Sequence, residues 1–321
     1  MKQKTVGDGH ILDGRTVDLA ISAVFKNEAV YLDEWITFHQ AQGFSRFFLF
    51  NDNSTDNFLE VLEPYLAAGV VVLDDAPEAP HFIRRQEASY DLALALARND
   101  CAWLAFIDID EFLFSPSGAI ADVLPANPLI AGVFIWWRIF GSSGHQSPPE
   151  VGVLLGFTRS AKFPKNLRET KEALAFGNRD FFAPRKRPIQ GTVIEGKSIV
   201  RPRLVRKAGV HVPQSYLGLM IDENKKLYIA GSSVLVRAFR WCMNRIYSDA
   251  SDRRVRVPTT QRLRINHYWS KSISELEKKA AKWDSNLKGA SLEDYLRWDN
   301  VLNEVEDREI LNNVPQANSS A

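Results

Sequence analysis

Residues 102–111 read AWLAFIDIDE, and this stretch decides the fold. The apolar run from Ala102 to Ile107 is typical of a buried strand, and it leads directly into Asp108-Ile109-Asp110-Glu111. Open α/β sheets bind their ligands outside the carboxyl ends of the strands. We therefore expect these acidic side chains to lie at a ligand site.

The spacing of the two aspartates favours a bound cation. On an extended backbone Asp108 and Asp110 project to the same side, because strand side chains alternate with period two. Two carboxylates on one face repel each other unless a cation lies near them, and hard oxygen ligands select Mg²⁺ or Mn²⁺. Such an ion can bridge a nucleotide diphosphate. A solvated acidic turn is the alternative, but the apolar Phe112-Leu113-Phe114 that follows favours the metal site.

The residues before this stretch alternate between strand and helix patterns. Short apolar runs predict strands at 18–25, 46–50 and 70–73. Helical spacing of apolar residues predicts helices at 28–42, 58–67 and 83–98. Strands that alternate with helices are typical of a parallel sheet, so we expect an α/β fold with a Rossmann-like sheet and helices on both of its faces.

The residues after Pro116 follow a less regular pattern. We expect a strand at 132–138, a Gly/Ser turn at 140–145, and a loop-rich region over 141–192. Further helices are predicted at 233–247, 272–284 and 292–305, and residues 312–321 are expected to form a frayed tail.

Composition and charge narrow the class of protein. The 321 residues are 45% hydrophobic and 11% aromatic, which excludes a disordered chain or a disulfide miniprotein, and the net charge is only +1. That total hides a segregation: residues 1–158 sum to −12, residues 159–271 to +17 and residues 272–321 to −4. A cationic block attracts phosphates or anionic surfaces, or it pairs with the acidic first half. No familiar nucleic-acid-binding motif accompanies it, so we do not expect nucleic acid as a partner.

The low cysteine content and the lack of a recognisable signal sequence favour a reducing compartment. Only Cys101 and Cys242 are present, too few for a disulfide framework. No apolar run follows the first lysines, and no uncharged apolar stretch reaches about 18 residues. We therefore expect a cytoplasmic protein. The predicted helix at 233–247 mixes apolar and basic residues, so it either packs on the domain or rests on the inner, anionic membrane surface.

Two further polar segments are candidates for ligand binding. The turn from Asn51 to Asp56 follows a predicted strand, where its side chains face a base or ribose or serve as turn formers. Arg84-Arg85-Gln86 lies near the start of a predicted helix, where it reaches a phosphate or nucleobase or pairs with the acidic turns.

Several of these segments resemble known enzymes when they are taken together. The chain is similar to glycosyltransferases of the family 2 type, and more closely to the subgroup akin to family 92, over nearly all of residues 18–282. The likeness is carried by segments in the expected order, namely Ala23 to Glu28, Glu34-Trp35-Ile36 with His39, Asn51 to Asp56, Asp108 to Phe112, Trp137 with Phe140 to His145, Lys197 to Pro202 with His211, and Ile265 to Tyr268 with Lys271-Ser272.

The resemblance implies a GT-A fold that transfers a sugar from a nucleotide diphosphate donor with Mn²⁺ or Mg²⁺. It implies metal binding by Asp108, Asp110 and His267, with Asp110 as the main ligand. The acceptor is expected to be a glycan or a lipid-linked saccharide. Donor contacts are expected from Asn27, Asp52, Arg85, Gln86, Asp108, Lys197 and Lys271, and acceptor contacts from Trp137, His145 and His211.

The mechanism leans toward inversion, which requires a carboxylate as general base. Glu111 and Asp222 are our candidates, with Asp180 and Glu195 as further acids in the cationic part. Lys197, Arg201 and Arg203 offset diphosphate charge in this reading. Two rival functions stay open: a nucleotide-sugar or glycan binding protein without catalysis, and a sugar nucleotidyltransferase. The latter usually carries a Gly-rich loop after the first strand, where this chain has Lys26-Asn27-Glu28.

The expected domain organisation is linear. Residues 1–17 form an N-terminal extension and residues 18–140 the nucleotide-sugar-binding α/β part. Residues 141–285 are expected to form the acceptor-side part of the same GT-A domain, and residues 286–321 a C-terminal helix and tail. Donor sugar, nucleobase, acceptor and linkage depend on pocket contacts that this pattern does not define.

Overall fold

The computed structural model describes residues 17–162, 196–225, 227–228, 262–283 and 291–314. These residues form two compact units that interleave along the chain. Unit 1 holds the described residues of 17–109, 117–135 and 197–228, and unit 2 holds those of 110–116, 136–196 and 262–314. The compact units are therefore not linear along the sequence, and the functional division expected above stays a prediction.

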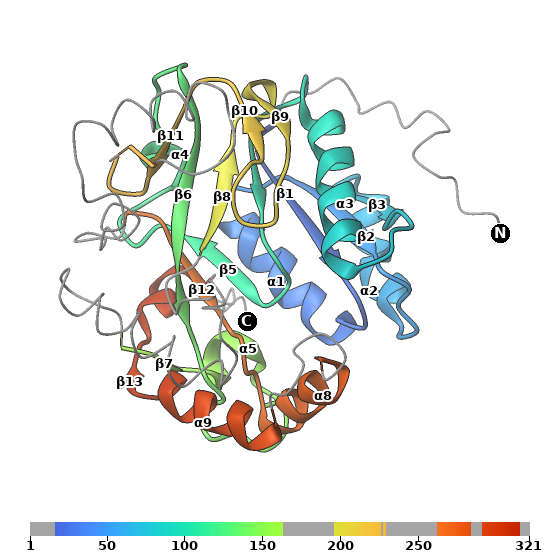
Figure 1. The fold of residues 1–321 in the computed structure, drawn as a ribbon, viewed down its shortest axis with the longest axis vertical. Coiled ribbons are helices and arrows are strands. Elements are labelled where there is room, and N and C mark those ends of the chain that lie inside the picture. The colour runs from blue at the N-terminus through green and yellow to red at the C-terminus, as the bar shows by residue number, and fades with distance from the viewer. Residues whose placement is uncertain (1–16, 163–195, 226, 229–261, 284–290, 315–321) are drawn as a thin grey trace, which may run out of the picture. The chain divides into compact units, whose positions relative to one another are not determined.

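The sheet of unit 1 is mostly parallel (Figure 1). Its first strands are β1 (Val17–Phe25), β2 (Arg46–Asn51), β3 (Val71–Asp75) and β4 (Cys101–Phe106). They are parallel in the order β3-β2-β1-β4. The antiparallel β8 (Gly196–Val200) follows, then the first half of β6 (Ile130–Ile139), with β11 (Leu219–Asp222) parallel to β6.

Helices cover both faces of this sheet, as predicted. The alternating residues of β2 face opposite sides, so Phe47 packs on Trp35 of α1 (Ala29–Ala41) while Phe48 belongs to the cluster formed with α3 (Phe82–Ala97). Helix α2 (Phe58–Ala67) packs beside α1. Every predicted strand and helix between residues 17 and 106 ends within two residues of its observed limit.

The decisive stretch differs from the expectation in one respect. Strand β4 ends at Phe106, and Ile109 and Asp110 form a turn before β5 (Glu111–Phe114) begins. The chain turns here because it leaves the parallel sheet of unit 1 and enters unit 2 between these two residues. Asp108 and Asp110 therefore do not lie on one continuous extended strand, and the prediction that they project to the same side of such a strand was wrong.

Unit 2 is built around β5, the second half of β6, and β12 (Arg264–His267). Strand β12 is antiparallel to β5 and parallel to β6. The unit also contains α5 (Gly152–Gly156), β7 (Arg159–Ser160), α8 (Ile273–Trp283), α9 (Leu292–Leu302), β13 (Val305–Glu306) and the 3-10 helix η4 (Glu309–Asn313). The small elements of unit 1 are α4 (Ile120–Val123), the 3-10 helix η2 (Pro202–Leu204), β9 (Val205–Lys207) and β10 (Ser215–Tyr216).

Buried hydrogen bonds and ion pairs connect the C-terminal segment of unit 2 to the rest of that unit. Asp299 of α9 is buried and accepts hydrogen bonds from the backbone N–H of Ser142 at 2.7 Å and from the Ser142 hydroxyl at 2.6 Å. Buried Arg264 pairs with both Asp307 and Glu309. The predicted frayed tail was wrong for its first residues, because residues 312 and 313 belong to η4.

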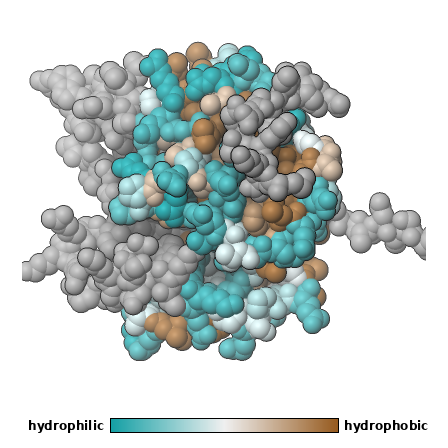
Figure 2. All heavy atoms as spheres, turned by 90° about the vertical axis from the view of Figure 1, so that its right-hand side faces the viewer, coloured by the Kyte–Doolittle hydropathy of each residue, from teal (hydrophilic) through white to brown (hydrophobic). Residues whose placement is uncertain are grey.

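Exposed apolar side chains are scattered over several elements. On the face shown in Figure 2, small hydrophobic patches lie among hydrophilic residues. Helix α3 exposes Phe82 and Ile83, and α2 exposes Leu59. Among the described residues, no helix combines the length and the apolar character that crossing a membrane requires. The predicted helix at 233–247 lies outside the described residues, as do the candidate acids at positions 180 and 195.

Candidate functional site

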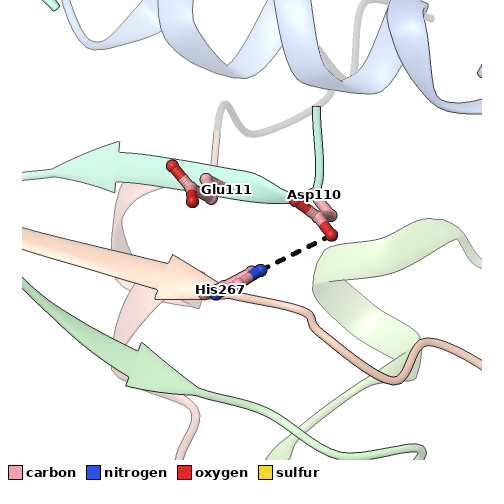
Figure 3. Close-up of side chains that lie close together, drawn as sticks. All are labelled: Asp110, Glu111 and His267. Carbon is pink, nitrogen blue, oxygen red and sulfur yellow. Dashed lines mark ion pairs between the residues drawn. The ribbon is translucent and has the colours of Figure 1, made fainter. Parts of the chain in front are cut away.

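Three side chains of unit 2 meet because of the pairing between β5 and β12. The register places His267 directly opposite Glu111, and the backbone N–H of Tyr268 donates to the carbonyl oxygen of Asp110 at 2.8 Å. Asp110, Glu111 and His267 each offer one ligand atom, and these atoms lie within 4.8 Å of one another. Figure 3 shows Asp110 and His267 turned toward each other, with Nε2 of His267 3.5 Å from Oδ2 of Asp110.

Basic side chains dominate the surroundings of Asp110. Burial alone would raise the pKa of this carboxyl group, but His267, Lys279 and Lys271 outweigh burial and lower its pKa. Nζ of Lys279 lies 3.7 Å from Oδ2 of Asp110. The carboxylate is therefore deprotonated across the physiological pH range and is available as an anionic ligand.

His267 is held by an aromatic neighbour. Its ring lies 4.4 Å from the ring of Trp137 on the adjacent strand β6, measured between centroids, and its side chain is largely buried. Nδ1 of His267 is buried and has no hydrogen-bond partner among the residues that the structure describes. Trp137, which we expected to contact the acceptor, therefore packs on the histidine of the cluster.

Asp108 has a separate set of partners within unit 1. Its Oδ1 accepts hydrogen bonds from Nε2 of Gln86 at 2.7 Å and from the hydroxyl of Tyr90 at 3.2 Å. Its Oδ2 forms an ion pair with Nζ of Lys197 at 2.8 Å. Gln86 and Lys197 are buried, whereas the Asp108 side chain keeps 32% of its surface exposed. The arrangement fixes the orientation of the carboxylate while leaving it in contact with solvent.

Asp52 is fixed by a two-point ion pair. Nε and Nη2 of Arg85 lie 2.7 and 3.1 Å from its two carboxylate oxygens, and Nη1 of Arg85 donates to the carbonyl of Ala79. This contact raises the pKa of Arg85. The arginine therefore pairs with an acidic turn, which is one of the two interpretations left open above. The other role, contact with a donor, stays a prediction.

Asn27 joins the first loop to the polar turn after β2. Its Oδ1 accepts from the backbone N–H of Thr55 at 2.7 Å, and its own N–H donates to Oγ of Ser54 at 3.0 Å. Asn27 has φ of +56°, a left-handed conformation that asparagine tolerates better than most residues. These hydrogen bonds connect the loop after β1 to the turn after β2.

The contacts given for Asp222, His145 and His211 are with residues outside these clusters. Asp222 of unit 1 is buried at the end of β11, where its Oδ1 accepts from the backbone N–H of Asn224 at 3.0 Å. Nε2 of His145 lies 3.0 Å from the carbonyl oxygen of Gly156 within unit 2. The carbonyl of His211 accepts from the hydroxyl of Ser198 in unit 1. Their catalytic and acceptor-binding roles stay predictions.

Two residues of these clusters, Tyr90 and Lys279, were not predicted from the sequence. Tyr90 follows Gln86 by four positions on α3, so helical spacing would have placed both side chains on one face. Lys279 had no comparable local signal, because its approach to Asp110 depends on the path of the chain from β12 into α8.

The cluster of unit 2 fits a divalent cation. It combines a deprotonated carboxylate, a second carboxylate and an imidazole whose Nε2 faces Asp110. Carboxylates bind Mg²⁺ and Mn²⁺, and an imidazole suits transition metals better than Mg²⁺.

Comparison with known protein families decides the relationship of this chain. The family model described as glycosyltransferase family 92 matches residues 16–282. The chain belongs to glycosyltransferase family 92. This membership confirms the resemblance carried by the motifs. The mostly parallel sheet with helices on both of its faces confirms the expected α/β fold.

Curated relatives of this family 92 chain come from plants. A glycosyltransferase family 92 protein of Ricinus communis is 31% identical over 160 residues, which cover 46% of this chain and 27% of the relative. One from Oryza sativa subsp. japonica is 33% identical over 144 residues, which cover 44% of this chain and 24% of the relative. The match thus spans about a quarter of the length of each relative.

Solved structures similar to this family 92 chain include two bacterial proteins. TarS of S. aureus aligns with a TM-score of 0.31 and 15% identity, covering 58% of this chain and 47% of that chain. Glucosyl-3-phosphoglycerate synthase from Mycobacterium tuberculosis, solved with Mn²⁺, UDP and glucosyl-3-phosphoglycerate, aligns with a TM-score of 0.31 and 14% identity. It covers 60% of this chain and 58% of that chain.

Proposed function

We propose that this family 92 chain transfers a sugar from a nucleotide diphosphate donor to a glycan or lipid-linked saccharide acceptor, with a divalent cation bound at Asp110, Glu111 and His267. The observation that carries the proposal is the pair of Asp110 and His267, a deprotonated carboxylate that faces an imidazole at 3.5 Å. Mn²⁺ is the cation that this donor set favours, and Mg²⁺ is the alternative. Bound there, the cation supplies Lewis-acid neutralisation of a leaving diphosphate.

Donor binding is proposed to involve Asp108, which lies two residues before Asp110 in the sequence. Only Ile109 separates Asp108 from Asp110, so covalent geometry keeps their Cα atoms within about 7 Å of each other. Asp108 is held by Gln86, Tyr90 and Lys197, and in this proposal its exposed carboxylate surface binds a donor hydroxyl group. A carboxylate that is already oriented binds a hydroxyl with less loss of side-chain entropy.

The position of the nucleobase is proposed from Asp52 and Arg85. Arg85 occupies both carboxylate oxygens through two nearly parallel hydrogen bonds, so the pair presents a fixed arrangement of donor and acceptor atoms. A planar base with complementary polar edges is the class of ligand that such a pair recognises. Asn27 supports the neighbouring turn through Thr55, and its predicted contact with the donor is part of the proposal.

The general base is proposed to be Asp222 rather than Glu111. Glu111 is fully buried beside His267, so in this proposal its carboxylate belongs to the cation cluster. A base must reach the acceptor hydroxyl directly or through one water molecule. Inversion of the anomeric centre is part of the proposal, as is a cytoplasmic location with acceptor contact through His145 and His211.

Two other functions are weaker alternatives. A nucleotide-sugar or glycan binding protein without catalysis would not need the cation-facing arrangement of Asp110. A sugar nucleotidyltransferase would be expected to have a Gly-rich phosphate loop after the first strand, where the chain has Lys26-Asn27-Glu28.

The test is donor hydrolysis and transfer measured with Mn²⁺ and with Mn²⁺ removed by a chelator. A thermal-shift screen of UDP, GDP and CMP sugars with Mn²⁺ first identifies the donor. Asp110→Asn is expected to abolish metal-dependent turnover while the circular dichroism spectrum is unchanged. Asp122→Asn, an acid-to-amide change at an exposed position of α4, is the matched control. Full turnover by Asp110→Asn would refute the proposal, and donor binding without turnover in the wild type would favour the binding protein.

A further inference from the structure

Lys279 of α8 holds its ammonium group between a carboxylate and an aromatic ring. Nζ donates to the carbonyl oxygen of Trp269 at 2.7 Å and lies 4.8 Å from the centroid of the Trp269 ring. The same Nζ lies 3.7 Å from Oδ2 of Asp110. The cation therefore sits beside the carboxylate on which the proposed metal site depends.

The surroundings of Lys279 fix its position. The Trp269 ring is stacked on Tyr295 of α9, with the centroids 5.8 Å apart and the planes 5° from parallel. The start of α8 is anchored by the backbone N–H groups of Ile273 and Ser274, which donate to the carbonyls of His145 and Gln146 at 3.0 Å each. The side chain of Lys279 is 23% exposed, so its ammonium is held by protein on most sides but can reach a ligand from solvent.

A metal ion and this ammonium would compete for one carboxylate. The ammonium stabilises the charged form of Asp110 in the structure described here. A divalent cation on the same oxygen would repel it, because two positive charges a few ångströms apart in a partly buried site are not well screened. The nearest new anion would be the diphosphate of the donor, which a lysine ammonium binds as a compact point charge.

We propose that Lys279 exchanges partners: it pairs with Asp110 when no divalent cation is bound, and with the donor diphosphate once the cation occupies Asp110. This inference rests on the proposed function, because it takes the same carboxylate as the metal ligand. It adds a residue that binds diphosphate and opposes binding of the cation in the absence of nucleotide. The bound cation and the nucleotide thereby favour each other through this one side chain.

In this proposal Lys279 weakens the binding of Mn²⁺ alone and strengthens the binding of nucleotide. Removing its charge should therefore change the two affinities in opposite directions. Replacing Lys279 with methionine keeps the length and apolar stem of the side chain and removes its charge. Lys279→Met is expected to bind Mn²⁺ about tenfold more tightly than the wild type without nucleotide, since a neighbouring charge within a few ångströms changes such an equilibrium by one or more powers of ten. With saturating Mn²⁺, the same variant is expected to bind UDP or GDP about tenfold more weakly. General damage to the site would weaken both.

The measurement is calorimetric titration of the full chain, first with MnCl₂ alone and then with UDP and with GDP at saturating Mn²⁺. Free Mn²⁺ is followed independently by electron paramagnetic resonance. Lys278→Met, at the exposed neighbouring position of α8, is the matched control and should leave both affinities unchanged. Lys279→Arg retains the charge and should stay within about threefold of the wild type for Mn²⁺.

The outcomes separate this inference from the proposed function. If the wild type binds Mn²⁺ in a manner that Asp110→Asn abolishes, the metal site stands. Unchanged or weaker Mn²⁺ binding by a folded Lys279→Met variant would then overturn only the exchange of partners, as would unchanged binding of both nucleotides. If the wild type binds no Mn²⁺, the metal site and the exchange both fall. Should Lys279→Met not fold, Lys279→Gln is titrated under the same criteria.

Discussion

Arg85 holds both carboxylate oxygens of Asp52, through Nε at 2.7 Å and Nη2 at 3.1 Å. Asp52 is almost fully buried, so the guanidinium supplies the charge that compensates for its loss of water. A planar fork is required for two contacts of this kind, and an ammonium group cannot reproduce it. The pair thus constrains the turn that follows β2.

Replacing Arg85 with lysine should therefore weaken nucleotide binding. Lys retains one of the two contacts, and the loss of the other is expected to cost about 1 to 2 kcal/mol, or roughly tenfold in the dissociation constant for the nucleotide of the preferred donor. Isothermal titration calorimetry measures this loss. Arg84→Lys, at an exposed position that pairs only with Glu87 in the contacts described, serves as the control. Equal affinities for Arg85→Lys and the wild type would contradict a role of this pair in donor binding.

Lys197 and Asp108 should show energetic coupling. Lys197 is buried and Asp108 is about one-third exposed, so removing either partner leaves a poorly compensated charge. We expect Lys197→Met to lower the free energy of unfolding by about 1 to 2 kcal/mol, a value reduced for the exposure of the carboxylate. The double variant with Asp108→Asn should recover part of that loss. Urea denaturation of the four proteins of this cycle measures the coupling, and strictly additive effects would show that the pair contributes nothing.

Asp299 should contribute strongly to the stability of the fold, although it lies outside residues 16–282, which the family model matches. Asp299→Ala removes the acceptor of the buried Ser142 N–H and hydroxyl and is expected to cost about 2 to 4 kcal/mol. Glu293→Ala, on the same helix but paired with Arg297 at the surface, should cost under about 1 kcal/mol. Thermal and chemical denaturation compare the two variants. Similar losses in both would mean that the Ser142 contacts are not maintained in solution.

His39 should make the fold sensitive to mild acid. Burial lowers the pKa of His39 to about 3, although its hydrogen bond to the carbonyl of Trp35 opposes the shift. The unfolded chain binds a proton near its ordinary pKa of about 6.5, whereas the folded chain does not, so stability falls as the pH drops below that value. The expected slope is about 1.4 kcal/mol per pH unit between roughly pH 6 and 4.

The check is the pH dependence of the urea midpoint in the wild type and in His39→Asn. The asparagine amide can donate to the same carbonyl but does not titrate. The variant should lose less stability than the wild type between pH 7 and pH 5, whatever its stability at pH 7. The lowered pKa of Asp110 adds a separate loss, but only below the ordinary carboxyl range near pH 4, because that acid stays ionised in the folded chain. Parallel curves above pH 5 would exclude His39 as the cause.

The first half of the fold was predictable because its signals are local. Strands and helices there follow the two periodicities of apolar residues, and glycines mark helix ends: Gly43 and Gly69 adopt φ of +95° and +66°, which other residues rarely tolerate. Local patterns also identified the acids at 108–111, whose sequence position fixes where they emerge from β4.

The grouping of these acids was not local and was predicted only in part. The side chains of Asp108 and Asp110 contact different residues because the chain turns between them. The pattern of apolar and polar residues along the sequence does not reveal that turn. Glu111 joins His267 through the antiparallel register of β5 and β12, which are about 150 residues apart in the chain. The motif resemblance supplied His267 where periodicity alone did not. The orientation of Lys279 depends on the same long-range pairing.

Arg264 shows where a fragment of this protein should not be cut. Its guanidinium is buried in β12, and its acidic partners Asp307 and Glu309 lie well past the last residue matched by the family. A polypeptide trimmed at residue 282 would keep the positive charge in the interior and discard the groups that neutralise it, at a cost of several kcal/mol. The evolutionary limits of the family and the physical limits of its folding unit therefore do not coincide in this chain.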